Sequence, residues 1–197
     1  MPKTLSIIRD EHRTIAAILD GMEHLVRDIR VRGKRIDPRV FHAMIYYLDT
    51  FAERVHHPRE DQFLFALMRR SGLHAYGLIA QLEREHEGGA DMLRRLAQAM
   101  IRYEEGGDTE FPAFEREVAQ FIERYREHMR KEEEQLFPLA LETLNAEDWA
   151  TIDAAFEQNR DPLAAARDDH TDFDKLFTHI VNIAPPPVGV GPPAERG

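Results

Sequence analysis

The chain has 197 residues, of which 43% are hydrophobic and 31% charged, and this composition suits one soluble globular domain with small additions. Its formal net charge is −10, and no cluster of Lys and Arg is large enough to suggest the basic face that a nucleic-acid-binding protein needs. Because there is no cysteine, disulfides, thiolate metal sites and cysteine catalysis are excluded, and no apolar run is long enough for a signal peptide or a membrane span. We therefore expect a cytoplasmic protein with no nucleic-acid or membrane partner.

The first two predicted elements are long amphipathic helices. One covers about 4–32 and ends at Gly33, and its apolar residues recur with the 3.6-residue period of a helix. The second is capped by Asp37, has Pro38 in its first turn and ends at a Ser-Gly pair. Pro58 lies inside the second helix and is expected to bend it, because proline lacks a backbone N–H.

Two more long helices follow. The third ends at a Gly-Gly pair, and the fourth opens at Asp108 or Thr109 with Pro112 in its first turn. Pro138 is expected to kink the fourth helix or end it. Four long helices joined by short loops predict an all-α fold, an antiparallel up-down four-helix bundle.

The remaining chain predicts two additional helices and a tail. Asn145 caps a helix that runs to about Arg160, and Asp161-Pro162 opens another that runs to about Ile183. The tail is rich in proline and glycine and is expected to be extended or disordered. The predicted divisions are a bundle over 1–145, additional helices over 146–183 and a tail over 184–197.

An internal repeat runs through the four long helices. The second and fourth helices each contain a His, a Glu four residues later, a second acid and a Leu-Phe pair, over 56–65 and 128–137. The first and third helices each contain a Glu followed by a His, at 11–12 and 85–86. The order short, long, short, long describes two copies of a helix pair.

The repeat places six ionisable side chains on the apolar faces that meet in the bundle core. Residues four apart lie one above the other on a helix, so each His of a long signature lies beside its Glu. A lone inward His is more often a hydrogen-bonded core residue, but four His and two buried carboxylates at matched depth need a cation to compensate them. Imidazole and carboxylate ligands suit iron, manganese or zinc, and six ligands with two-fold symmetry suit two ions. The predicted metal ligands are His12, His56, Glu60, His86, His128 and Glu132.

These motifs resemble those of the hemerythrin-like family, in its His-His-Glu cation-binding branch. The resemblance covers about 4–140 and rests on the two HxxxE signatures and on the acid-His pairs that precede them. It implies an antiparallel four-helix bundle around a non-haem di-iron centre, with zinc or manganese as the other candidate metals. It also implies that Glu60 and Glu132 bridge the two irons and that the four His are terminal ligands.

The ligand pattern departs from that of the oxygen-carrying hemerythrins. Those proteins have a second His one turn after the His of the third helix, where this sequence has Ala90, and an Asp in the fourth-helix motif, where it has Glu132. The pattern is closer to that of the bacterial iron-centre-repair di-iron proteins. Those proteins also carry a Cys-containing N-terminal segment, and this sequence has no Cys.

Several residues beside the signatures have two interpretations each. Gly88 and Gly89 either leave room beside a metal for a small ligand or allow close helix contact or a bend. Asp61 and Glu133 either support ligand His residues or, as we expect, are solvated surface charges. Tyr125 either forms a hydrogen bond near the site or, as we expect, packs in the core.

The other His residues have no HxxxE partner. His170 follows an acid, as the predicted ligands do, but we expect it to be structural. The rest are expected at the surface or in ordinary packing, and they are His24, His42, His57, His74 and His179.

Three functions are consistent with a di-iron site. One is binding of, or reaction with, a small ligand such as dioxygen, peroxide or nitric oxide, in sensing, storage or stress defence. The second is iron-centre repair or iron delivery, and the third is a structural metal-binding module. No nucleophile-base pair, phosphate loop or dinucleotide fingerprint is present, so no catalytic residue is assigned and enzyme activity stays open. The additional helices either cover the bundle or form a homodimer face.

Overall fold

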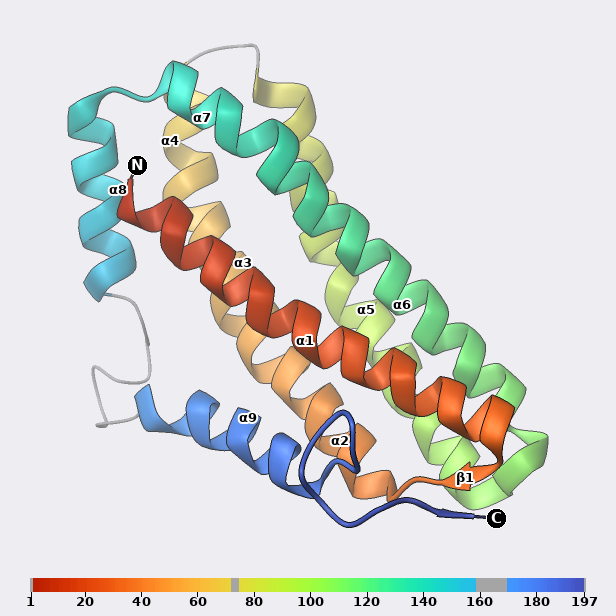
Figure 1. Cartoon of the computed structure of the whole chain (residues 1–197). Coiled ribbons are helices and arrows are strands. Elements are labelled where there is room, and N and C mark those ends of the chain that lie inside the picture. Colours follow the sequence, from red (N-terminus) through yellow and green to blue (C-terminus); the bar gives the residue numbers. More distant parts are fainter. Residues whose placement is uncertain (1, 72–74, 159–169, 197) are drawn as a thin grey trace.

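The computed structural model describes residues 2–71, 75–158 and 170–196. Four long helical rods run antiparallel, and two further helices lie along one side of them (Figure 1). This arrangement confirms the predicted helical bundle. The first and third rods are α1 (Lys3–Arg32) and α5 (Tyr76–Gly106). The second rod is α2 (Pro38–Tyr47), η1 (Leu48–His56), α3 (His57–Arg59), η2 (Glu60–Phe65) and α4 (Ala66–Ser71). The fourth rod follows η4 (Gly107–Thr109) and is α6 (Phe111–Lys131), η5 (Glu132–Leu136) and α7 (Phe137–Thr143).

The first loop forms where the sequence predicts it. Gly33 adopts a left-handed conformation with φ of 58°, and its N–H donates to the carbonyls of Asp28 and Ile29 at the end of α1. Asp37 accepts a hydrogen bond from the N–H of Arg39 and so caps α2. Local hydrogen bonds of Gly33 and Asp37 therefore define the end of α1 and the start of α2.

The second and fourth rods contain π-helical segments next to their prolines. The segments η1 and η2 flank α3, which contains Pro58, and η5 directly precedes α7, which contains Pro138. A widened turn lets a helix continue where proline supplies no N–H and crowds the preceding carbonyl. The fourth rod therefore does not end at Pro138 but continues to Thr143.

The bundle core consists of two apolar clusters with the predicted ligands between them. Phe41 belongs to the cluster toward the Gly33 end of the bundle, and Phe65 belongs to the other. Along α1, Ile8 belongs to one cluster and Ile15 to the other, and His12 lies between them. The polar site is thus sealed by apolar packing along the bundle axis in both directions.

The helix α8 (Ala146–Gln158) covers one side of the bundle (Figure 1). As predicted, it begins at Asn145, whose Oδ1 accepts hydrogen bonds from the N–H groups of Glu147 and Asp148. Its Ile152 and Phe156 are fully buried in the second apolar cluster. The helix therefore packs against α1 and against η2, the segment that begins with the predicted ligand Glu60.

The helix α9 (His170–Ile183) lies against α2. Phe173 of α9 contacts Tyr47 and Phe51 of the second rod with ring-centroid distances of 6.4 and 5.1 Å. The predicted helix start at Asp161-Pro162 lies outside the described residues.

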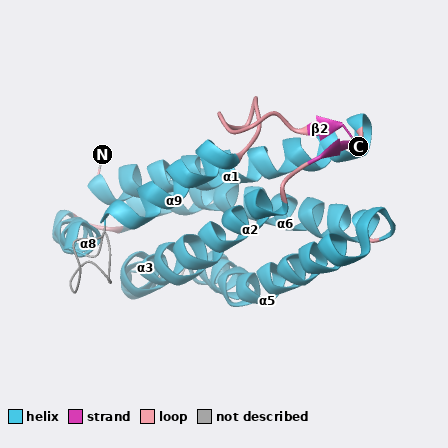
Figure 2. Ribbon diagram, turned by 90° about the horizontal axis from the view of Figure 1, so that it is seen from below, coloured by secondary structure: helices cyan, strands magenta, loops and turns pink. Residues whose placement is uncertain are grey.

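The tail folds back onto the bundle. Its end forms β2 (Glu195–Arg196), which pairs antiparallel with β1 (Lys34–Arg35) at one end of the molecule (Figure 2). Before it, the N–H of Val190 donates to the carbonyl of Val181, and the N–H of Gly191 donates to that of Ala184. The expectation of an extended chain holds at β2, whereas the segment before it forms turns.

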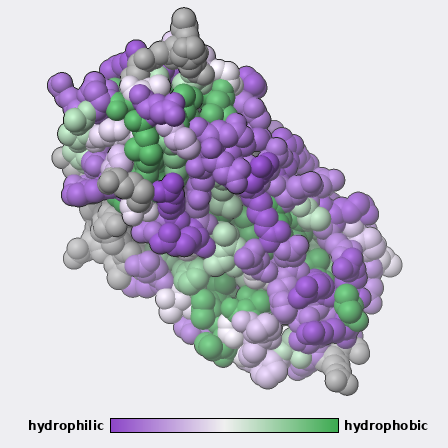
Figure 3. Space-filling view, turned by 45° about the horizontal axis from the view of Figure 1, so that its top comes forward, coloured by the Kyte–Doolittle hydropathy of each residue, from purple (hydrophilic) through white to green (hydrophobic). Residues whose placement is uncertain are grey.

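The face of the molecule in Figure 3 is largely hydrophilic, with hydrophobic patches between the hydrophilic residues. No helix in the described part of the chain is long and apolar enough to cross a membrane.

Candidate metal centre

The structure brings the six predicted side chains together in the middle of the bundle. All are buried, with side chains at most 7% exposed. They form two groups whose candidate ligand atoms all lie within 4.8 Å of one another. The first group is His12, His56, Glu60 and Glu132, and the second group is Glu60, His86, His128 and Glu132. The two carboxylates belong to both groups, so the structure contains two overlapping groups of candidate ligands.

The shared carboxylates have no exposed surface, and none of their four oxygens accepts a hydrogen bond from a described residue. The closest nitrogen is His12 Nε2, which lies 3.1 Å from Glu132 Oε2. Burial and the neighbouring charge of Glu132 raise the pKa of Glu60 well above its usual range. Two uncompensated buried carboxylates are costly, and divalent cations would satisfy all four oxygens.

The four predicted imidazoles are held in one common orientation. Each Nδ1 lies within hydrogen-bond distance of a carboxylate on a neighbouring rod, which leaves Nε2 facing the middle of the site. Carboxylates that accept the second ring N–H in this way orient and polarise the His ligands of metal sites. The pairs are His12 with Glu133 at 2.8 Å, His56 with Glu11 at 2.8 Å, His86 with Asp61 at 2.9 Å and His128 with Glu85 at 3.0 Å.

Two of these outer carboxylates correct the sequence prediction. We expected Asp61 and Glu133 to be solvated surface charges, but each accepts a hydrogen bond from a buried imidazole. Each directly follows a shared Glu in the sequence, so the two adjacent acids of each HxxxE signature have different contacts. The first carboxylate faces the middle of the site, and the second reaches a His of the next rod.

The outer carboxylates repeat with the same two-fold relation as the inner groups. Glu11 of α1 bonds a His of the second rod, and Glu85 of α5 bonds the equivalent His of the fourth rod. A cation completes each arrangement, because Arg59 contacts Glu11 and Lys131 contacts Glu85. The internal repeat of the sequence is therefore a repeat of hydrogen-bonded layers around the site.

His57 is a buried residue at the site that the sequence analysis assigned to the surface or to ordinary packing. It is 5% exposed, and neither ring nitrogen has a hydrogen-bond partner among the described residues. It forms a third group with His86 and His128, and its ring stacks on that of His86 with a centroid distance of 4.1 Å. Strict helical periodicity places residue 57 off the inward stripe of His56, and the π-helical turns that change this direction are not visible in the sequence.

Glu53 and Tyr125 complete the surroundings of His57. Glu53 Oε2 lies 3.6 Å from His57 Nδ1, and the hydroxyl of Tyr125 donates a hydrogen bond to Glu53. A Cβ atom on Gly89 would collide with the carboxylate of Glu53, at 2.7 Å from Oε1. The space at Gly89 is therefore taken by a carboxylate, and Tyr125 does form a hydrogen bond near the site instead of only packing.

The remaining His residues do not join the site where the structure describes them. His42 is exposed and pairs with Glu104, and His179 is exposed on α9. His24 lies one turn from Asp28. His74 and the side chain of His170 lie outside the described part of the structure.

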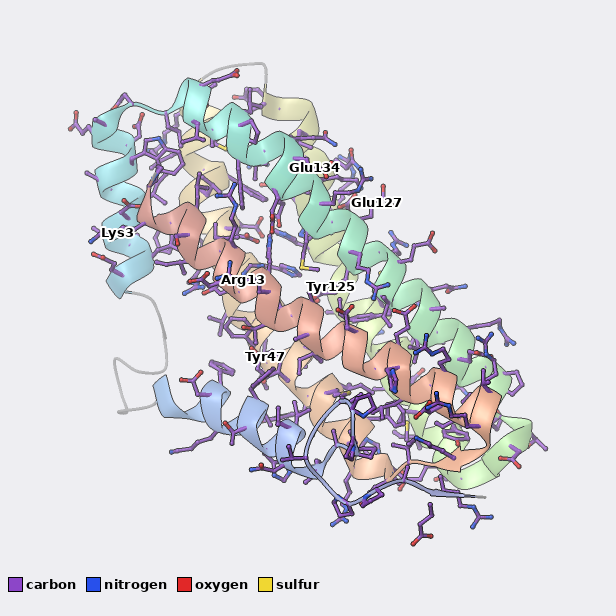
Figure 4. The ribbon with its side chains drawn as sticks, in the orientation of Figure 1. Lys3, Arg13, Tyr47, Tyr125, Glu127 and Glu134 are labelled. Atoms are coloured by element: carbon purple, nitrogen blue, oxygen red, sulfur yellow. The ribbon has the colours of Figure 1, made fainter. Side chains whose placement is uncertain are left out.

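A pocket of about 220 Å³ reaches the site between α5 and α6. Its lining includes the buried rings of His57, His128 and Tyr125 as well as the more exposed Glu127 and Lys131. Figure 4 shows Tyr125 inside the bundle and Glu127 of the same helix on its outer side. The pocket is large enough for a small ligand such as dioxygen, and it connects the second group to the surface.

A family model described as hemerythrin HHE cation binding domain matches residues 3–140. The matched segment includes both groups and all four outer carboxylates, and it ends before α8. No curated protein and no solved structure matches the chain.

Proposed function

The chain belongs to the hemerythrin HHE cation-binding family, and on that premise we propose that it holds two non-haem irons that bind or react with a small ligand in the cytoplasm. The ligand would be dioxygen, peroxide or nitric oxide, and the setting would be sensing, storage or stress defence. The six predicted side chains would hold the irons, with Glu60 and Glu132 shared between them. Iron at such a centre supplies open coordination positions and redox chemistry.

The observation that carries this proposal is the set of unpaired donors. Four carboxylate oxygens and the Nε2 atoms of His12 and His56 are buried with no hydrogen-bond partner among the described residues. Buried polar atoms normally have a hydrogen-bond partner, and leaving these atoms without one would destabilise the fold by several kcal/mol. Imidazole and carboxylate donors without sulfur suit iron, manganese or zinc, and the family match indicates a cation.

The residues of the chain have separate tasks at this centre. Glu11, Asp61, Glu85 and Glu133 hold the imidazoles with Nε2 inward, and the apolar clusters on both sides exclude bulk water. The pocket between α5 and α6 provides a route for a small molecule. This route supports the small-ligand function over a purely structural metal site, which would need no access.

Metal analysis and spectroscopy test the proposal directly. Protein produced with supplemented iron should contain about two irons per chain by plasma mass spectrometry and should show oxo-to-iron absorption in air. Peroxide, azide or nitric oxide should then change that spectrum. Zinc or manganese alone in iron-supplemented protein, or no metal, would contradict the proposal, and transfer of both irons to an apo-acceptor would support delivery instead.

A pair of variants makes the assignment residue-specific. Glu132→Gln keeps the size of the side chain but removes the charge shared by both groups, so both irons should be lost. His42→Gln changes an exposed His outside the site and should leave the iron content unchanged. Two irons in Glu132→Gln would show that the shared carboxylate is not a ligand.

A further inference from the structure

We propose that His57 is a seventh metal ligand, which adds a third imidazole to the second group and makes the two metal positions unequal. This inference rests on the proposed di-iron centre. The first group would then supply two imidazoles, from His12 and His56, and the second group three, from His57, His86 and His128. The two shared carboxylates would serve both positions.

The His57 ring is in a state that ordinary packing does not explain. The ring is buried, and both nitrogens lack a hydrogen-bond partner in the described part of the chain. A buried imidazole with two unsatisfied nitrogens costs free energy that ordinary packing does not return. One ring nitrogen lies within 4.8 Å of nitrogens of His86 and His128. His86 and His128 direct Nδ1 at carboxylates, and their Nε2 atoms lie 3.0 Å apart, so the inward nitrogens of the three rings can all donate lone pairs to one cation.

A carboxylate lies beside Nδ1 of His57 as it does beside Nδ1 of the other four imidazoles, but at a distance longer than a hydrogen bond. Each of those has a carboxylate next to Nδ1, and Nδ1 of His57 faces Glu53 at 3.6 Å. Tyr125 donates to Glu53 and fixes the carboxylate, while Gly89 provides the space for it. A carboxylate beside the outer nitrogen is the usual arrangement for a metal-bound His.

The internal repeat also distinguishes His57 from its equivalent residue. Residue 57 follows the HxxxE His of the second rod, and the equivalent residue of the fourth rod is the buried, apolar Met129. In the same way, Glu53 is equivalent to Tyr125, and Gly89 is equivalent to Ile15. These three places, where the repeat changes chemical type, lie next to one another. They are the imidazole, its carboxylate and the space that the carboxylate occupies.

The matched variant for testing this inference is His57→Met, which installs the residue that the repeat places at 129. His24→Met is the control, because it removes a His of α1 outside the site. Circular dichroism and thermal unfolding of the metal-free proteins establish that each variant folds. Anaerobic titration with ferrous iron against a chelator then gives the two binding constants, and Mössbauer spectra of ⁵⁷Fe-loaded protein compare the two iron environments.

We expect the wild-type protein to show two quadrupole doublets of equal area. His57→Met should bind the first iron as the wild-type protein does, bind the second roughly tenfold or more weakly, and show doublets that converge. His24→Met should match the wild-type protein in every measurement. If His57→Met retains both binding constants and both doublets, His57 is not a ligand.

A second variant covers the case in which His57→Met does not fold. His57→Gln keeps a polar side chain of similar size and should weaken the second iron in the same way, whereas unchanged binding would overturn the inference. Failure of the proposed di-iron centre gives a different result, because wild-type protein would then not bind two irons. Two irons in the wild-type protein with no effect of either variant would overturn only the role of His57.

Discussion

The two helix pairs give the site two equivalent faces, and the chain completes them differently. On the face formed by α1 and the second rod, Arg59 contacts Glu11 and its guanidinium lies 5.1 Å from the centroid of the Phe156 ring of α8. On the face formed by α5 and α6, Lys131 contacts Glu85 in the equivalent way, but both residues line the pocket that reaches the second group. Arg59 is 3% exposed, whereas the side chain of Lys131 is 13% exposed.

This difference shows what the additional helices do. The repeat alone produces two similar layers of imidazoles, carboxylates and cations, so it provides no reason for one face to be more accessible. The helix α8 packs over the face formed by α1 and the second rod, where Phe156 contacts Arg59. On the same face, Phe173 of α9 packs against Phe51, whose ring stacks on His56. The pocket that reaches the second group lies on the other face, between α5 and α6. A further pocket reaches His12 of the first group between α1 and the fourth rod.

Removing the contact of α8 with the first face should change the difference between the two faces most. Phe156 is fully buried, so Phe156→Ala should lower the free energy of unfolding of the metal-free protein by about 3–5 kcal/mol. Arg59 would lose its aromatic neighbour, and the first group should release iron to a chelator faster. Urea unfolding and the kinetics of iron release measure the two effects.

The control for Phe156→Ala is Leu141→Ala, because Leu141 is 49% exposed on α7 and should change stability little. If Phe156→Ala destabilised the protein but iron release stayed at the wild-type rate, α8 would stabilise the bundle without controlling access. The two faces would then differ in structure but not in function.

A pH series should separate the first group from the second. Burial disfavours a charged His12, but the Glu132 carboxylate 3.1 Å from Nε2 and the hydrogen bond from Nδ1 to Glu133 outweigh it and raise the pKa of His12 to about 9. Because this folded-state pKa lies above the unfolded value of 6.5, its contribution is fully present below pH 6.5 and is lost as the pH rises through about 9. The metal-free protein should therefore lose about 3 kcal/mol of stability between pH 6.5 and 9.

Other groups at the site do not reverse this sign. The raised pKa of Glu60, caused by burial and by Glu132, also lowers stability as the pH rises. Burial lowers the pKa values of His56 and His57, which affects stability only below pH 6.5. Urea unfolding at each pH tests the slope, and His12→Gln should flatten most of it. A slope that is equally steep in His12→Gln would assign the dependence to another group.

The sequence predicted what depends on short-range pattern and on repetition. The apolar period, Gly33 and Asp37 predicted the rods and their first loop, and the two HxxxE signatures predicted six side chains that the structure brings together. These features repeat at fixed spacings along single helices, so no tertiary information is needed to see them.

The sequence could not show features that depend on the direction of a side chain between rods. Whether Asp61 faces solvent or the ring of His86 depends on how the second rod rotates against α5. The inward direction of His57 depends on π-helical turns, which a regular period does not describe. The adjacent histidines at 56 and 57 were the available signal, but a regular helix turns neighbouring residues onto different faces.

The glycines of α5 provide the smallest and sharpest test of the second face. Gly88→Ala should stabilise the protein by up to about 1 kcal/mol, because the new Cβ meets no atom within 4 Å and alanine favours a helix. Gly89→Ala gains the same helix propensity, but its Cβ would displace the carboxylate of Glu53 from Tyr125. A hydrogen bond to a buried carboxylate contributes about 1.5–3 kcal/mol, so Gly89→Ala should be net destabilising by about 1 kcal/mol.

The expected stability changes of Gly88→Ala and Gly89→Ala have opposite signs. Because both substitutions act on the same helix and the same unfolded chain, the difference between them reports on Glu53. Urea unfolding of the metal-free variants measures them under one set of conditions. If Gly89→Ala were as stabilising as Gly88→Ala, Glu53 would move aside without loss, and it could not hold His57 in place. If the signs differ as expected, the second face depends on a fixed carboxylate, and the equivalent first face, where Ile15 stands in place of Gly89, has no room for one.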